Sequence, residues 1–229
     1  MKTYHRILRY QQPMDHPCRE RVRTIDAHTG GEPLRIVLSG VPMPEGNDVL
    51  SRRAYMRDKL DLYRRMLMHE PRGHADMYGC LPVPPNDEGA DFGVIFMHNA
   101  GYSTMCGHAI IALAKLTVEM GWKPVEEPET RVVIDAPCGR IEAFVKIENG
   151  KPKEVSFLGV PSFAVALDQQ VEVDGYGEVT YDLAFGGTFY AYVCAEKLDL
   201  GLDPSNLSAI SKLGMVIKDA VASRGGSIA

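Results

Sequence analysis

Asn99-Ala-Gly-Tyr-Ser-Thr-Met-Cys-Gly-His108 joins an apolar strand to an apolar helix, and the rest of the chain can be interpreted as support for this connection. Residues 92–98 before it read Phe-Gly-Val-Ile-Phe-Met-His, a run that is typical of a buried strand. Residues 109–116 after it read Ala-Ile-Ile-Ala-Leu-Ala-Lys-Leu, a helical pattern with apolar residues on nearly every side. We therefore expect Cys106 at or near the N-terminus of a helix.

The expected position of Cys106 has a chemical consequence. Unbonded backbone N–H groups and the helix dipole favour negative charge at a helix N-terminus, so they stabilise a thiolate and attract a carboxylate. Gly107 lets a ligand approach the backbone closely, and His108 can donate to a carboxylate or pair with a thiolate. The alternative interpretation is that Cys106 packs as a small apolar residue. The position alone leaves both open.

Composition limits the classes of ligand. The chain has 229 residues, of which 45% are hydrophobic, and its net charge of -5 predicts no binding to nucleic acid or to an anionic membrane. The N-terminus has no signal-peptide pattern, so we expect a cytoplasmic protein with small-molecule ligands. No cysteine spacing indicates a metal site, and reduced thiols are expected at residues 18, 80, 106, 138 and 194.

The order of patterns along the chain predicts a duplicated α+β plan. Residues 1–20 are polar and are expected to form a flexible leader. Residues 21–150 are expected to form a first α/β half that carries the cysteine, and residues 151–229 a partial second half. Each half reads as a series of strands followed by one helix, and the second copy is incomplete.

In the first half, strands are expected at 21–26 and 34–38 around a glycine turn, and later at 77–83, 131–135 and 140–147. Asp26, His28 and Glu32 lie near that turn and could form a catalytic or metal site, although turn hydrogen bonding is the simpler interpretation. Ser51 is expected to cap a helix that buries the residues Met56, Leu60, Tyr63 and Leu67.

Three further expectations concern charged groups and the second half. Most arginines of the Ser51 helix should lie on a solvated face, and Arg72 should pair with Asp76 in the loop after it. Asn149-Gly150 predicts a hairpin turn, and strands are expected at 153–158, 163–167, 178–183 and 189–194. A last helix at 205–222 should be capped by Ser205 and should bury Leu207, Ile210, Leu213 and Ile217.

Three motifs carry a family resemblance. Thr24-Ile-Asp-Ala-His-Thr-Gly-Gly-Glu-Pro33, Glu70-Pro-Arg-Gly-His-Ala-Asp-Met-Tyr-Gly79 and Met105-Cys-Gly-His-Ala109 together resemble the proline racemase family. The resemblance runs from about residue 21 to about residue 222. Within the family, the second and third motifs are most similar to those of the trans-3-hydroxy-L-proline dehydratases.

The resemblance implies a fold and a set of site residues. The fold is that of diaminopimelate epimerase, an α+β (α/β) fold with two pseudo-symmetric halves, each a curved sheet around a central helix. Cys106 would take the α-proton of a small imino acid, and the 3-hydroxyl would leave as water. Gly107 and His108 match the positions that hold the substrate carboxylate, and Tyr78 matches an aromatic wall residue. The resemblance further implies no cofactor and a homodimer.

This chain departs from the family pattern in one respect. The second helix-end motif, Asp-Arg-Ser-Pro followed by Thr-Gly or Cys-Gly, is absent from the 229 residues, so we expect a C-terminally truncated member. Three hypotheses follow for its function. The first is a cofactor-independent dehydratase, the second is a proline racemase or hydroxyproline epimerase, and the third is an inactive fragment, because half a cleft cannot preorganise both sides of a transition state.

Overall fold

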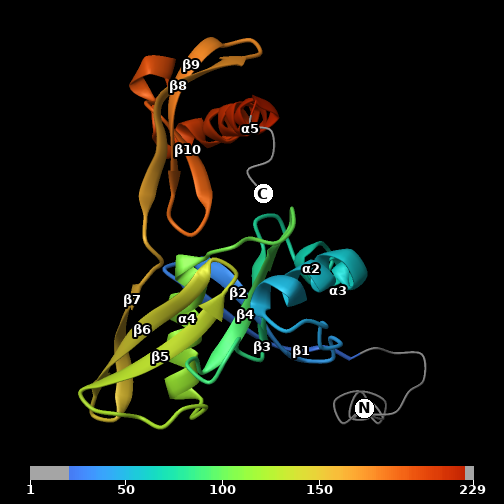
Figure 1. The fold of residues 1–229 in the computed structure, drawn as a ribbon, viewed down its shortest axis with the longest axis vertical. Helices are drawn as coiled ribbons and strands as arrows, with labels where there is room; N and C mark the ends of the chain where they lie inside the picture. The colour runs from blue at the N-terminus through green and yellow to red at the C-terminus, as the bar shows by residue number, and fades with distance from the viewer. Residues whose placement is uncertain (1–20, 225–229) are drawn as a thin grey trace, which may run out of the picture.

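The computed structural model describes residues 21–224, which form two lobes (Figure 1). The first lobe comprises residues 21–158, the second lobe comprises residues 163–224, and residues 159–162 connect them. The leader expected at residues 1–20 lies outside the described residues, as do residues 225–229.

The first lobe is built on a seven-stranded sheet whose strand order follows the sequence. Its strands are β1 (Arg23–Thr29), β2 (Glu32–Ser39), β3 (Tyr78–Val83), β4 (Phe92–His98), β5 (Glu129–Ala136), β6 (Gly139–Glu148) and β7 (Lys151–Leu158). β2 pairs with β3 and β4 pairs with β5 in parallel, whereas the other neighbours are antiparallel. The expected strands, including the hairpin of β1 and β2, are therefore confirmed.

The sheet of the first lobe is covered by helices on both faces. α4 (Gly107–Glu119) packs with Val94 and Phe96 of β4, while Ile95 and Met97 of the same strand pack with α2 (Val49–Lys59) and α3 (Asp61–Met68). A strand buried on both faces needs apolar residues at successive positions, which explains the continuous apolar run of β4.

α4 is the central element of the first lobe. Strands β1, β2, β5, β6 and β7 all contact it, which explains why its apolar residues lie on nearly every side. Ile110 and Leu113 are fully buried, and burial of each side chain contributes roughly 1.5–3 kcal/mol. The surrounding sheet thus fixes the axis of the helix that begins after Cys106.

The helix expected to begin at Ser51 differs from the prediction. Asp48 is the N-cap of α2, and its carboxylate accepts a hydrogen bond of 2.7 Å from the Ser51 backbone N–H. The Ser51 hydroxyl accepts a hydrogen bond from the Asp48 N–H, so Ser51 is the third helical residue of a capping box rather than the cap. The helix also ends at Leu60, after which α3 begins.

Two arginines of these helices are not on a solvated face, contrary to expectation. Arg64 is buried; it pairs with Asp61 at 2.6 Å and donates to the carbonyl groups of His98 and Asn99. Arg53 donates to the carbonyl of Tyr102 at 2.6 Å. These carbonyl groups belong to the connection between β4 and α4, so the arginines fix the backbone that leads to Cys106.

The hairpin turn expected at Asn149-Gly150 is confirmed. Both residues have positive φ, 54° and 72°, as a type I′ turn requires, and they join β6 to β7. The seven-stranded sheet therefore extends to Leu158, beyond residue 150, where we expected the second half to begin.

The second lobe is a three-stranded antiparallel sheet with one helix. Its strands are β8 (Phe163–Val173), β9 (Gly177–Phe185) and β10 (Phe189–Val193), with β9 in the centre. Two short 3-10 helices, η1 (Glu196–Leu198) and η2 (Pro204–Asn206), precede α5 (Leu207–Arg224). No helix in residues 21–224 is long and apolar enough to cross a membrane.

α5 buries two of the four residues expected on its inward face. Leu213 and Ile217 pack on the sheet with Val171 and Tyr181. Leu207, the first residue of α5 after η2, is 66% exposed, and Ile210 is half-buried. Ser205 lies within η2, where the Asp203 carboxylate accepts its N–H, so it does not cap α5.

Candidate active site

Cys106 is the N-cap residue of α4, as predicted. The first helical hydrogen bond runs from the Ile110 N–H to the Cys106 carbonyl, at 3.1 Å. The N–H groups of Gly107, His108 and Ala109 therefore have no partner within the helix, and they lie next to the sulfur. The side chain of Cys106 is in the core cluster, and the residue is 8% exposed.

His108 is a titratable partner of the thiol. Its Nδ1 lies 3.2 Å from Cys106 Sγ, and its Nε2 lies 3.3 Å from the carbonyl oxygen of Pro33. Because a carbonyl can only accept, Nε2 carries the proton in a neutral ring, which leaves Nδ1 to accept the thiol proton. Thr29 also donates to the carbonyl of His108 at 2.9 Å, so the β1–β2 hairpin fixes the start of α4.

Tyr78 forms a wall beside these two residues. Its ring makes an edge contact with the His108 ring at 5.0 Å between centroids and stacks on His98 at 5.8 Å. Its hydroxyl is hydrogen-bonded to the Ser103 hydroxyl. Burial, followed by the charge of Cys106, raises the pKa of Tyr78, so the hydroxyl stays protonated and can donate.

The electrostatic balance at Cys106 differs from expectation. Burial raises the pKa of the thiol above its ordinary value, and the carboxylate of Glu32 adds to the increase. The N–H groups of Ala109 and His108 and the hydroxyl of Tyr78 lower the pKa, as helix geometry predicts, but burial is the largest effect. Burial therefore favours the neutral thiol in this conformation, and a bound cation, solvent access or proton transfer to His108 would favour the thiolate.

Gly107 lies against Phe157 of β7. A Cβ atom on Gly107 would lie 3.2 Å from the ring of Phe157, a close contact. Glycine therefore allows Phe157 to approach the first turn of the helix, beside the unbonded N–H groups.

The structure does not bring Asp26, His28 and Glu32 together as a group that could hold a metal ion. Both carboxylate oxygens of Asp26 accept from Arg35, at 2.8 and 2.7 Å, and this pairing lowers the pKa of Asp26. His28 Nδ1 accepts from the N–H of Gly31 within the turn. Within residues 21–224 no group of three or more His, Cys, Asp or Glu side chains could hold a metal ion.

The expected ion pair between Arg72 and Asp76 is not found in residues 21–224. Arg35 holds this loop instead, because its Nη1 donates to the carbonyl groups of Leu67 and Arg72. The sequence did not indicate these bonds of Arg35, because Arg35 is distant from the loop in sequence and lies in a strand whose pattern is that of an ordinary β-hairpin.

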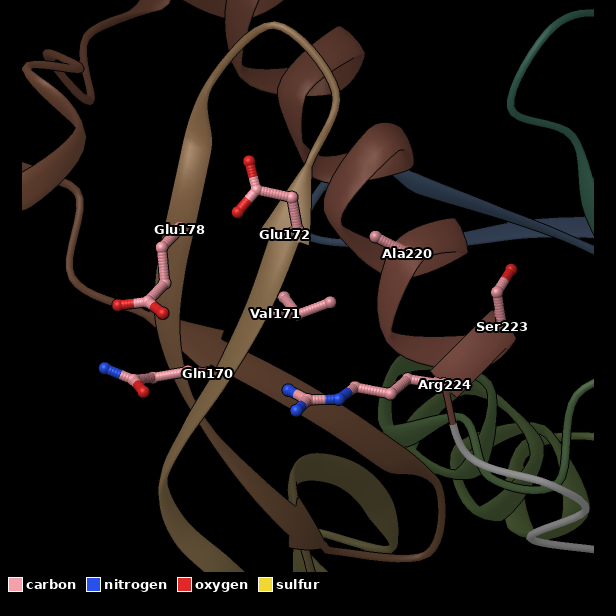
Figure 2. A pocket seen from close by; sticks show the side chains of 7 residues that line it. All are labelled: Gln170, Val171, Glu172, Glu178, Ala220, Ser223 and Arg224. Carbon is pink, nitrogen blue, oxygen red and sulfur yellow. The ribbon is translucent and has the colours of Figure 1, made fainter.

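Two hollows on the surface lie away from Cys106. One, of about 490 Å³, lies between the β8–β9 hairpin and the end of α5, and Figure 2 shows Glu172, Glu178 and Arg224 around it. The other, of about 530 Å³, is lined by residues of the loop after α3, among them His69 and Asp76. Neither contains the residues predicted for the site.

Comparison with known proteins gives a family match over most of the chain. A family model described as proline racemase matches residues 24–226. A trans-L-3-hydroxyproline dehydratase from Xenopus tropicalis is 48% identical over 210 residues, which are 91% of this chain and 60% of the relative. A trans-3-hydroxy-L-proline dehydratase from Azospirillum brasilense is 49% identical, and the match covers 86% of this chain and 59% of the relative.

A relative with a different name is similar to the same degree. A 3-hydroxyproline 2-epimerase from Burkholderia multivorans is 48% identical, over 86% of this chain and 59% of its own length. The chain thus spans about 60% of the length of the curated relatives that it matches.

Solved structures share the fold. A hydroxyproline epimerase from Agrobacterium vitis, with bound trans-4-hydroxy-L-proline, has a TM-score of 0.84 at 29% identity, covering 89% of this chain and 60% of that one. A probable proline racemase from Agrobacterium radiobacter, with bound carbonate, has a TM-score of 0.83 at 28% identity, covering 88% of this chain and 60% of that one.

Proposed function

The chain belongs to the proline racemase family, and from that premise we propose that it carries the α-proton base of a cofactor-independent trans-3-hydroxy-L-proline dehydratase. Loss of the α-proton and of the 3-hydroxyl as water converts this substrate to a pyrroline-2-carboxylate. The proposal is supported by relatives that are 48–49% identical and are named as dehydratases of this substrate.

One observation carries the proposal: the Cys106 sulfur lies at the N-terminus of α4, 3.2 Å from His108 Nδ1. Nδ1 can accept the thiol proton while Nε2–H remains bonded to the Pro33 carbonyl. The thiolate formed in this way is the base, and the imidazolium beside it stabilises its charge. An ammonium group on a bound substrate would further lower the pKa of Cys106, in opposition to burial.

The helix terminus supplies the second requirement, which is a site for the substrate carboxylate. The α-proton of an imino acid is a very weak acid, so the developing charge needs preorganised donors. The N–H groups of Gly107 and His108 and the α4 dipole provide such donors, and neutralising the carboxylate makes the α-proton more acidic. Tyr78 lies beside this region and would close one side of the substrate ring.

Proton exchange in D2O tests the base directly, because exchange needs the base and the carboxylate site but not departure of the hydroxyl. We expect the 229-residue chain to exchange the α-proton of trans-3-hydroxy-L-proline for deuterium, as followed by proton NMR. Cys106→Ser should lower the exchange rate by about 100-fold or more, because a serine hydroxyl is a far weaker acid than a thiol. Cys194→Ser, at an exposed thiol of the second lobe, is the matched control and should leave the rate unchanged.

Two results would contradict the proposal. One is exchange that persists in Cys106→Ser, and the other is the absence of both exchange and binding of pyrrole-2-carboxylate, a planar mimic of the deprotonated ring, in calorimetry. Binding without exchange would instead favour the inactive-fragment hypothesis over the dehydratase.

The second candidate is epimerisation of a hydroxyproline, which the similarity to the Burkholderia multivorans epimerase favours. Both reactions begin with the same proton transfer and differ in the fate of the carbanion. A pyrroline product supports dehydration, whereas recovery of the opposite stereoisomer at the α-carbon supports epimerisation. The notion of a homodimer remains a proposal, which sedimentation of the chain would test.

A further inference from the structure

The segment that leads to Cys106 is hydrogen-bonded to the second lobe. Thr104 Oγ1 donates to the Gly187 carbonyl at 2.6 Å and lies 2.6 Å from Thr188 Oγ1. The hydroxyl of Thr104 has one proton, and the carbonyl receives it, so Thr188 is the donor in the second bond. Both bonds therefore join Thr104 to the turn between β9 and β10, which points toward the first lobe in Figure 1.

The same residue is also held within the first lobe. The N–H of Cys138, in the turn between β5 and β6, donates to the carbonyl of Thr104 at 3.1 Å. Thr104 is thus fixed at its side chain by one lobe and at its carbonyl by the other. A shift of the second lobe must therefore either break these bonds or displace the backbone next to Cys106.

Gly187 brings the turn into direct contact with the neighbour of Cys106. Its φ is +93°, and a Cβ atom on it would lie 2.6 Å from Met105 Cγ and 2.7 Å from Met105 Cβ. No side chain larger than hydrogen fits there, so the backbone of the turn packs directly on Met105. Met105 in turn packs against the core cluster that contains Cys106.

We propose that Thr104, Gly187 and Thr188 are positioning residues that form a latch, which holds Met105 and Cys106 in place when the second lobe lies against the first. The latch touches no reacting atom and acts on the sulfur through the backbone of Met105. The inference rests on the proposed role of Cys106 as the base, since it concerns how that base is held.

The latch residues are distinct from the titratable neighbours of the sulfur. The titratable groups that face Cys106 are Tyr78 and Cys80 of β3, His108 of α4 and Glu32 of β2. None of them belongs to the latch. A change in the titration of Cys106 after latch mutation therefore reports movement of the sulfur out of its buried position.

Alkylation of Cys106 by iodoacetamide, resolved by peptide mass spectrometry across pH, measures that movement without substrate. We expect Thr188→Val and Thr104→Val to raise the rate about three- to tenfold near pH 8 and to lower the midpoint of its pH profile, because the freed thiol is less buried. Thr104→Ser keeps the hydroxyl and should restore the rate of the unchanged chain. Thr180→Val, on β9 but outside the latch, is the matched control and should leave the profile unchanged.

The latch proposal is contradicted if both valine variants keep the alkylation rate and the pH midpoint of the unchanged chain, with an unchanged melting temperature. It is equally overturned if Thr180→Val shifts the profile as much as they do. Should Thr104→Val fail to fold, Thr188→Val decides the question. Failure of the unchanged chain to bind pyrrole-2-carboxylate would count against the proposed function alone, because the alkylation rates would still decide the latch.

Discussion

In the first lobe helices cover both faces of the sheet, whereas in the described part of the second lobe α5 covers one face and leaves Tyr190 and Tyr192 of β10 more than half exposed. The residues proposed for catalysis all belong to the lobe with the doubly covered sheet. The second lobe reaches them through the turn at Gly187. The proposed base therefore lies in the lobe with the more deeply buried sheet, whereas the segment just before it is bonded to the less buried second lobe.

Truncation of one phenylalanine in each lobe tests this contrast with the largest expected effect. Phe96 is fully buried between β4 and α4, so Phe96→Ala should lower the free energy of unfolding by about 3–5 kcal/mol. Phe189 of β10 is 42% exposed, and Phe189→Ala should cost about 1 kcal/mol. Urea unfolding measures the loss of unfolding free energy in both variants, and equal losses would show that the cores of the two lobes are buried to the same extent.

Alkaline pH should destabilise the first lobe. Burial raises the pKa values of Tyr78, Cys80 and Cys106, which all belong to that lobe. Each of these thiols has a higher pKa in the folded state than in the unfolded state. Its contribution to stability is complete below the pKa of the unfolded state, near 8.5, and is lost as the pH rises toward the pKa of the folded state. Each such thiol should therefore lower the free energy of unfolding by about 1.4 kcal/mol per pH unit above about pH 8.5.

Cys80→Ala provides the control for this pH dependence, because it removes a fully buried thiol without removing the proposed base. The slope of stability against pH should become shallower in the variant, as measured by urea unfolding at several pH values. An identical slope in the variant would mean that the Cys80 thiol does not contribute to the alkaline loss.

The smallest effect is expected on the uncovered face of the second lobe. Tyr192 is 58% exposed, so Tyr192→Ser should change the free energy of unfolding by less than about 0.5 kcal/mol. A loss of more than about 1 kcal/mol would show instead that this face is buried in solution, and sedimentation would then reveal whether a second copy covers it.

The sequence predicted local elements well, because periodicity and turn chemistry are local properties. The apolar run 92–98, the helix start at Cys106 and the turn at Asn149-Gly150 are all confirmed. It could not predict which helix cap forms, since Asp48 and Ser51 are both good caps and reciprocal bonding decides between them. The break of the helix at Leu60 likewise had no signal in the periodic pattern.

Interactions between distant residues were the part of the site that sequence patterns missed. The bond from Thr29 to the carbonyl of His108 and the bonds of Thr104 to the β9–β10 turn join residues 79 or more positions apart. The direction of the pKa shift at Cys106 was also missed, because helix geometry is visible in the sequence but the depth of burial is not.

Two arginines, the buried Arg64 of α3 and the half-buried Arg53 of α2, link the stability of those helices to the site. Arg64 and Arg53 donate to carbonyl groups of the connection between β4 and α4, from helices that lie on the opposite face of the sheet from α4. These bonds hold residues 98–102, the first part of the connection, while α2 and α3 remain docked. In amide hydrogen exchange, this connection should behave as part of the same cooperatively opening unit as the two helices, although it has no regular secondary structure of its own.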